Sequence, residues 1–159
     1  MLVCSLMITA GSLSAQVISE LPPFERAIAV IKHFEGLHNK AEHYPYVGYG
    51  HKVLLGENLS TDMTEEEADS LLRSDLMKLC KMFSCYGQDS LLLATLAYNV
   101  GAYRLLGYDD RPKSRLIQML DEGDRNIYRE YITFRKYKGK VIPSLELRRR
   151  MEFELLYIP

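Results

Sequence analysis

The sequence predicts a mostly helical α+β domain with one small β excursion. Apolar residues recur at helical spacing through most of the chain, and helix-capping residues precede several of these runs. Residues 44–55 break the pattern because they are aromatic and punctuated by glycine, which is typical of a short hairpin or irregular strands. The chain has 159 residues, enough for one domain with a single sizeable core.

Two proline residues open the first expected helix, and a capping box opens the second. After Pro22-Pro23, apolar residues fall at i, i+3, i+4 and i+7, which predicts an amphipathic helix ending near residue 35. Thr64 and Glu67 have the spacing of a capping box, in which each side chain binds the other's backbone N–H. They predict the start of a long helix whose buried face carries Ala68, Leu71, Leu72, Leu76 and Leu79.

Four further helices are expected in the second half of the chain. Residues 91–100 are apolar almost all round, so they predict a helix in the middle of the core, capped by Asp89 and ended by Gly101. Residues 114–120 are expected to form another helix, which is stopped at Gly123. Asp124 and Ser144 are expected to cap the last two helices, and the final one reaches about residue 156.

The charge balance excludes a general nucleic-acid binder. Twenty basic residues face 21 acidic ones, so the chain lacks the basic excess that releases counterions from a nucleic acid. Charge is nevertheless segregated, with seven acids in residues 57–75 and nine bases in residues 125–150. Three interpretations are open: the two blocks pair with each other, the basic block binds an anionic polymer, or both are solvated helix faces. We expect no nucleic-acid partner and a monomeric protein.

The three cysteines do not have the spacing of metal ligands. Cys80 and Cys85 are five residues apart, so either they form a disulfide across the end of a helix or both are free thiols. No Cys-x-x-Cys or paired histidine spacing accompanies them. The sequence therefore predicts neither a metal site nor a cofactor.

Residues 1–15 are expected to be a secretory signal peptide, followed by one domain at 16–159. The first 19 residues carry no charge, and small residues precede a predicted cleavage site between Ala15 and Gln16. The alternative is a frayed N-terminal helix. Cleavage would place the domain in the periplasm or outside the cell, with no stable membrane insertion.

Glu35 is the candidate catalytic residue. It follows Phe34 at the end of an amphipathic helix, where a partly desolvated carboxyl group can hold a proton near neutral pH. Such a carboxyl group is what the general acid of a glycosidase requires. The alternative is an ordinary solvated glutamate.

The residues around Glu35 resemble the phage-type, T4-like lysozymes. Glu35-Gly36-Leu37 precedes Gly48-Tyr49-Gly50-His51, as in that family, and residues 63–68, 96–101, 113–124 and 145–155 resemble further family segments in the same order. The resemblance implies a small lobe with a short β-hairpin, a helical lobe and a cleft between them. It also implies a peptidoglycan substrate, hydrolysis of the β-1,4 bond between N-acetylmuramic acid and N-acetylglucosamine, and Glu35 as the general acid.

The same resemblance assigns His51 and Asp75 to a structural pair. His51 matches the family histidine after the glycine pair, and Asp75 matches an acid on the long helix. We expect their side chains to lie within ion-pair distance and to tie the small lobe to that helix.

The sequence departs from the family at the second catalytic position. The family places an aspartate and then a threonine after the catalytic glutamate, but here those positions fall on Tyr44 or Lys40 and on Tyr46. The remaining candidates in the loop are Glu42, as a second carboxylate, and His43, which would orient a water or a substrate hydroxyl. The third possibility is that Glu35 acts alone, as in lytic transglycosylases.

Several polar and aromatic residues are candidates for sugar contacts. Tyr44, Tyr46 and Tyr49 either pack the hairpin or form sugar-stacking walls. Asn99 either holds a sugar acetamido group or caps a helix carbonyl. Besides the hydrolase and the transglycosylase, a non-catalytic protein that binds the cell wall within conjugative-transfer or secretion machinery stays open.

Overall fold

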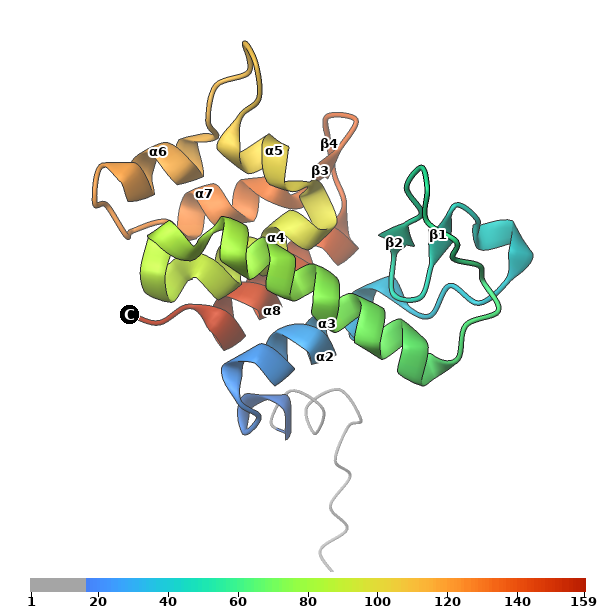
Figure 1. The fold of residues 1–159 in the computed structure, drawn as a ribbon. Helices are drawn as coiled ribbons and strands as arrows, with labels where there is room; N and C mark the ends of the chain where they lie inside the picture. The colour runs from blue at the N-terminus through green and yellow to red at the C-terminus, as the bar shows by residue number, and fades with distance from the viewer. Residues whose placement is uncertain (1–16) are drawn as a thin grey trace, which may run out of the picture.

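The computed structural model describes residues 17–159 and confirms the mostly helical, lysozyme-like architecture (Figure 1). The expected signal peptide and its cleavage site lie outside the described residues. No helix within 17–159 is both long and apolar enough to cross a membrane. The longer elements are the helices α2 (Pro23–Glu35), α3 (Glu65–Met82), α4 (Ser90–Val100), α5 (Ala102–Leu106), α6 (Arg115–Asp121), α7 (Tyr128–Ile132) and α8 (Pro143–Leu156).

The shorter elements of the described residues are two antiparallel strand pairs and three 3-10 turns. Strands β1 (Tyr46–Val47) and β2 (His51–Lys52) form the expected hairpin. A second pair, β3 (Lys136–Tyr137) and β4 (Lys140–Val141), is not predicted by the sequence analysis. The 3-10 turns are η1 (Ala41–His43), η2 (Ser84–Asp89) and η3 (Thr133–Arg135).

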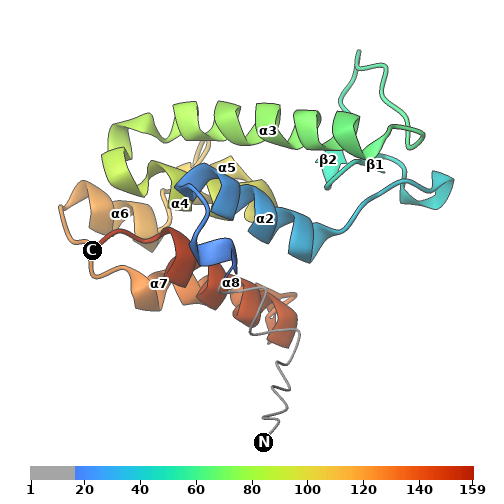
Figure 2. The same cartoon turned by 90° about the horizontal axis from the view of Figure 1, so that it is seen from below.

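Two lobes meet along α3. Residues 36–64, with η1, β1 and β2, form a small lobe at the N-terminal end of α3, and α4 to α8 form the helical lobe (Figures 1 and 2). Helix α2 precedes the small lobe in sequence but packs against α8 and α4 of the helical lobe. Its C-terminal residue, Glu35, therefore lies where the chain leaves one lobe for the other.

Helix α4 is the centre of the core, as its composition predicts. Its residues from Leu92 to Ala97 are all buried, including Thr95, whose hydroxyl donates to the Leu91 carbonyl at 2.8 Å. That bond satisfies the one polar side chain in this stretch without leaving the helix. Helices α2, α3 and α8 pack around α4.

One of the four expected helix caps is confirmed by hydrogen bonds, and the other three do not form. Thr64 Oγ1 accepts from the Glu67 N–H and Glu67 Oε2 accepts from the Thr64 N–H, at 3.2 and 2.7 Å. Ser114, expected as the first residue of its helix, is instead the N-cap of α6, and its Oγ accepts from the Ile117 N–H at 3.4 Å.

The three wrong caps fail because each residue has a different partner or position. Asp89 occupies the expected N-cap position of α4, but its carboxylate binds Arg125 at 2.8 and 2.9 Å and makes no capping hydrogen bond. Asp124 accepts from the Asn126 N–H at 2.8 Å, which makes a turn, and α7 begins only at residue 128. Ser144 lies inside α8, which begins at Pro143 because proline has no N–H to leave unpaired in the first turn.

The two cysteines of the described chain are free thiols. Cys80 is partly buried on α3, while Cys85 is exposed on η2. Burial raises the pKa of the Cys80 thiol.

Candidate functional site

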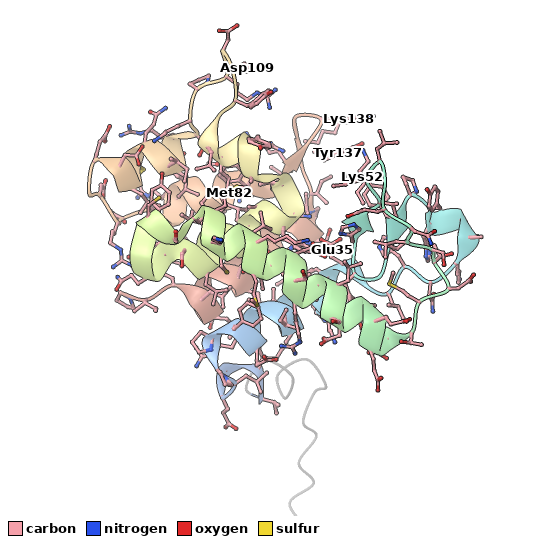
Figure 3. All side chains as sticks on the ribbon, in the orientation of Figure 1. Glu35, Lys52, Met82, Asp109, Tyr137 and Lys138 are labelled. Carbon is pink, nitrogen blue, oxygen red and sulfur yellow. The ribbon has the colours of Figure 1, made fainter. Side chains whose placement is uncertain are left out.

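Glu35 is the last residue of α2 and lies at the junction of the two lobes (Figure 3). Gly36, with φ of 68°, ends the helix and turns the chain toward the small lobe. The Glu35 side chain is 21% exposed, so it is partly buried and still accessible to solvent.

The two carboxyl oxygens of Glu35 have different surroundings. Oε1 accepts from Arg148 Nη1 of α8 at 2.6 Å, and Asn99 Nδ2 at the end of α4 makes a long contact at 3.5 Å. Oε2 has no hydrogen-bond partner within residues 17–159 and lies beside Gly50, where an added Cβ would come within 3.3 Å of it. One oxygen is therefore fixed by the helical lobe, while the other is available to a ligand.

A buried network of ion pairs holds Arg148. The Glu152 carboxylate, fully buried on α8, accepts from Arg148 Nε at 2.8 Å and from Arg149 Nη2 at 3.0 Å. The Tyr131 hydroxyl donates to its other oxygen at 2.8 Å. Burial alone would lower the pKa of Arg148, but Glu152 and Glu35 outweigh it and leave that pKa raised. Arg148 is thus a permanent cation that orients Glu35.

Asn99 belongs to the same network. Its Oδ1 accepts from Arg149 Nη2 at 3.1 Å, while its Nδ2 points to Glu35. Sequence reasoning named Asn99 as a candidate, but it missed Arg148 as a site residue. The spacing of Arg148, Arg149 and Glu152 predicts pairing along one helix, yet nothing local indicates a partner 113 residues away.

His51 and Asp75 are in contact, as expected from the sequence, and Glu57 joins them. Asp75 Oδ2 lies 2.5 Å from His51 Nδ1, and Glu57 Oε2 lies 2.9 Å from Nε2. Burial alone would lower the pKa of His51, but the hydrogen bonds with Glu57 and Asp75 outweigh it, so the pKa is raised. The imidazolium therefore links β2 to α3 and to the loop that follows β2.

This contact makes a testable contribution to stability. The His51 pKa is raised above its unfolded value of about 6.5, so its stabilisation is complete below that pH and is lost as pH rises through the folded pKa. We expect His51→Gln to lower the free energy of unfolding most near pH 6, with the difference from wild type shrinking toward alkaline pH. Urea titrations across that range measure it.

The matched control for this measurement is His33→Gln. His33 is exposed on α2 and makes no ion pair within residues 17–159. Its difference from wild type is expected to be small and independent of pH. A pH-independent effect of His51→Gln would contradict the ion-pair explanation.

The structure does not bring Glu42 or His43 into contact with Glu35. Both lie on η1, at the end of the small lobe farthest from the helical lobe (Figures 1 and 2). Glu42 is exposed, and His43 Nδ1 accepts from the Lys40 N–H at 3.2 Å. Within residues 17–159, neither side chain forms a hydrogen bond or ion pair with Glu35.

The three tyrosines of the hairpin region have different environments. Tyr44 and Tyr46 are 60% and 44% exposed, so their rings are accessible. Tyr49 is buried, donates its hydroxyl to Glu65 Oε1 at 2.9 Å, and accepts the Tyr98 hydroxyl on its carbonyl at 2.9 Å. Its position favours hairpin packing over a sugar-stacking role.

The described residues contain no group of three or more histidine, cysteine, aspartate or glutamate side chains arranged to hold a metal ion. Ionisable side chains at the junction of the lobes instead pair with one another. The chemistry that this arrangement supports is proton transfer by one carboxyl group.

Comparison with known proteins identifies one family. The family model named phage lysozyme matches residues 32–152. The matched range includes Glu35, the whole small lobe, α3 and most of α8. A search of the curated proteins gives no match.

Proposed function

The chain belongs to the phage lysozyme family, and from this premise we propose that it cleaves the β-1,4 bond between N-acetylmuramic acid and N-acetylglucosamine with Glu35 as general acid. Family membership makes it a lysozyme-type enzyme that hydrolyses peptidoglycan. The specific bond and the role of Glu35 are our proposals. The observation that carries them is the asymmetric setting of Glu35 at the junction of the lobes, where Arg148 holds Oε1 and no residue of 17–159 hydrogen-bonds to Oε2.

In the proposed reaction, Oε2 of protonated Glu35 gives its proton to the bridging sugar oxygen while the bond from that oxygen to C1 breaks. Positive charge then develops on the sugar ring, as in other glycosidases. The carboxylate that remains on Glu35 is paired with Arg148 at 2.6 Å, so the product of proton transfer is stabilised where it forms.

The step after proton transfer distinguishes a hydrolase from a lytic transglycosylase. In a hydrolase, water attacks C1 with help from a base; in a lytic transglycosylase, the sugar's own 6-hydroxyl attacks after Glu35 takes its proton. Glu42 and His43 lie on η1, at the end of the small lobe farthest from the helical lobe, which favours the transglycosylase as the second candidate. If Glu42 or His43 acts in the hydrolase, η1 must approach Glu35 when substrate binds.

The proposal extends to the substrate-binding and structural residues and to the location of the protein. The exposed rings of Tyr44 and Tyr46 are offered as sugar-contacting surfaces, Asn99 as a group that orients Glu35 or a sugar amide, and His51–Asp75 as a structural pair. A peptidoglycan substrate supports export to the periplasm or beyond. Association with conjugative-transfer or secretion machinery is a further proposal.

Product analysis tests the reaction directly. We expect purified peptidoglycan treated with the protein to release fragments with reducing-end sugars, detected by mass spectrometry before and after borohydride reduction. Products with 1,6-anhydro ends, which resist that reduction, would replace the hydrolase with the transglycosylase. The absence of any soluble fragment would reject both.

A further inference from the structure

The turn of the β1–β2 hairpin, Gly48-Tyr49-Gly50, packs directly against the helices around Glu35. Both glycines have positive φ angles, 56° and 93°, which a residue with a side chain adopts only at a cost. A Cβ at Gly48 would lie 3.3 Å from the Cβ of Ala68 on α3. A Cβ at Gly50 would lie 3.3 Å from Glu35 Oε2. The turn therefore borders the space next to the carboxyl oxygen that is available to a ligand.

Contacts from α2, α3 and α4 hold Tyr49 in this turn. Its hydroxyl donates to Glu65 Oε1 of α3 at 2.9 Å, and Lys32 Nζ of α2 lies 4.8 Å from the centre of its ring. Its carbonyl accepts from the Tyr98 hydroxyl of α4, also at 2.9 Å. The first two contacts act on the side chain, whereas the Tyr98 bond acts on the backbone beside Gly50. Tyr98 thus ties the backbone of the small lobe to the central helix of the helical lobe.

Both polar groups of the peptide between Tyr49 and Gly50 are engaged. Its C=O accepts from Tyr98, and its N–H, which belongs to Gly50, donates to the Val47 carbonyl at 3.2 Å. A planar peptide group that is held at both polar atoms has little freedom to rotate. The Tyr98 hydroxyl and the hairpin together therefore fix the position of Gly50 beside Glu35.

The surroundings of Tyr98 keep its hydroxyl a hydrogen-bond donor. Burial, followed by the carboxylates of Asp75 and Glu35, raises the pKa of the Tyr98 phenol, while Arg148 acts in the opposite direction. The phenol therefore stays protonated at neutral and mildly alkaline pH. The influence of both carboxylates also places Tyr98 within electrostatic reach of Glu35 and of the His51–Asp75 pair.

We propose that Tyr98 is a positioning residue for proton transfer, because its bond to the hairpin backbone sets where Gly50 lies relative to Glu35 Oε2. The inference rests on the proposed function, since it takes Glu35 as the general acid. The bridging sugar oxygen has to enter the space that Gly50 borders in order to receive the proton. A displacement of about 1 Å in such an arrangement costs up to about 10²-fold in rate. Because the Tyr98 hydroxyl binds Tyr49, it acts through the hairpin and not by contact with the substrate.

The test variant is Tyr98→Phe, which removes only the hydroxyl. The matched control is Tyr157→Phe, because the Tyr157 hydroxyl also donates to a backbone carbonyl at 2.9 Å, that of Arg125. Tyr157 is near the C-terminus, which lies on the side of the helical lobe away from the small lobe (Figure 1).

Steady-state kinetics on soluble, uncrosslinked peptidoglycan strands measure the effect on the reaction. We expect Tyr98→Phe to lower kcat about tenfold, the order for one lost hydrogen bond that leaves a carbonyl unpaired. KM is expected to change by less than about twofold, because binding of the ground state is retained. The control is expected to match wild type in both constants.

Amide hydrogen exchange, followed by NMR, tests the anchor without relying on activity. The Gly50 amide is the probe, because it is on the same peptide group as the carbonyl that Tyr98 holds. We expect Tyr98→Phe to speed its exchange about tenfold and Tyr157→Phe to leave it unchanged.

The two readouts and the control give distinct outcomes. Unchanged kcat or unchanged Gly50 exchange in Tyr98→Phe, an equal loss of kcat in both variants, or a raised KM at constant kcat would overturn the inference. A wild type that releases no fragments would instead reject the proposed function. An active wild type with any of the former results leaves that function standing and removes only the role of Tyr98.

Discussion

Replacing Glu35 with glutamine is expected to lower peptidoglycan cleavage by about 10³-fold and to leave the fold intact, since a general acid contributes roughly 10²–10⁴. Glutamine has nearly the same shape, and its amide oxygen still accepts from Arg148. It has no carboxylic proton to give to the leaving oxygen. Turbidity loss of a cell-wall suspension measures the rate, and thermal unfolding measures the fold.

The matched control for this variant is Glu66→Gln, the same chemical change at an exposed position in the first turn of α3. Its activity is expected to equal that of wild type. If Glu35→Gln kept wild-type activity, the general acid would be elsewhere. If the wild type and Glu35→Gln both bound muropeptides and neither cleaved them, the non-catalytic wall-binding alternative would replace the enzyme.

The largest expected effect on stability belongs to Glu152→Ala. Its fully buried carboxylate binds Arg148, Arg149 and the Tyr131 hydroxyl. Alanine would leave Arg149 as a buried cation without a carboxylate, and Arg148 with Glu35 alone. Removing one partner of a buried ion pair costs about 3–5 kcal/mol, because the remaining charge is desolvated and unpaired.

Urea unfolding of Glu152→Ala and Glu154→Ala measures this cost. Glu154 is exposed on the same helix two residues later, so its replacement is expected to change the free energy of unfolding by less than about 0.5 kcal/mol. Equal effects of the two substitutions would show that the buried network adds nothing beyond helix propensity.

Sequence reasoning succeeded where the signal is local. The boundaries of α2, the Thr64 capping box and the buried character of α4 depend on residues within one or two turns of each other. The contact of His51 with Asp75 came from the family resemblance, since no periodicity connects them. The caps assigned to Asp89 and Asp124 failed because each side chain has a competing partner that a local pattern does not reveal.

The missed features have a common physical cause. The contact of Arg148 with Glu35 spans 113 residues, and only packing of α8 against α2 creates it. Strands β3 and β4 have two residues each, too few for an alternating pattern. Their only signal is Lys138-Gly139, whose φ angles of 47° and 79° form the tight turn that a two-residue hairpin needs.

The docking of α2 on α8 has a consequence for the order in which a ribosome makes this protein. Glu35 is synthesised early, but the side chain that holds its Oε1 comes from α8, near the end of the sequence. Arg26 of α2 likewise donates to the Leu155 carbonyl, at 3.2 Å. In a nascent or prematurely terminated chain that lacks α8, Glu35 has no Arg148 to hold its Oε1, so we expect the proposed cleavage activity only after α8 has been translated.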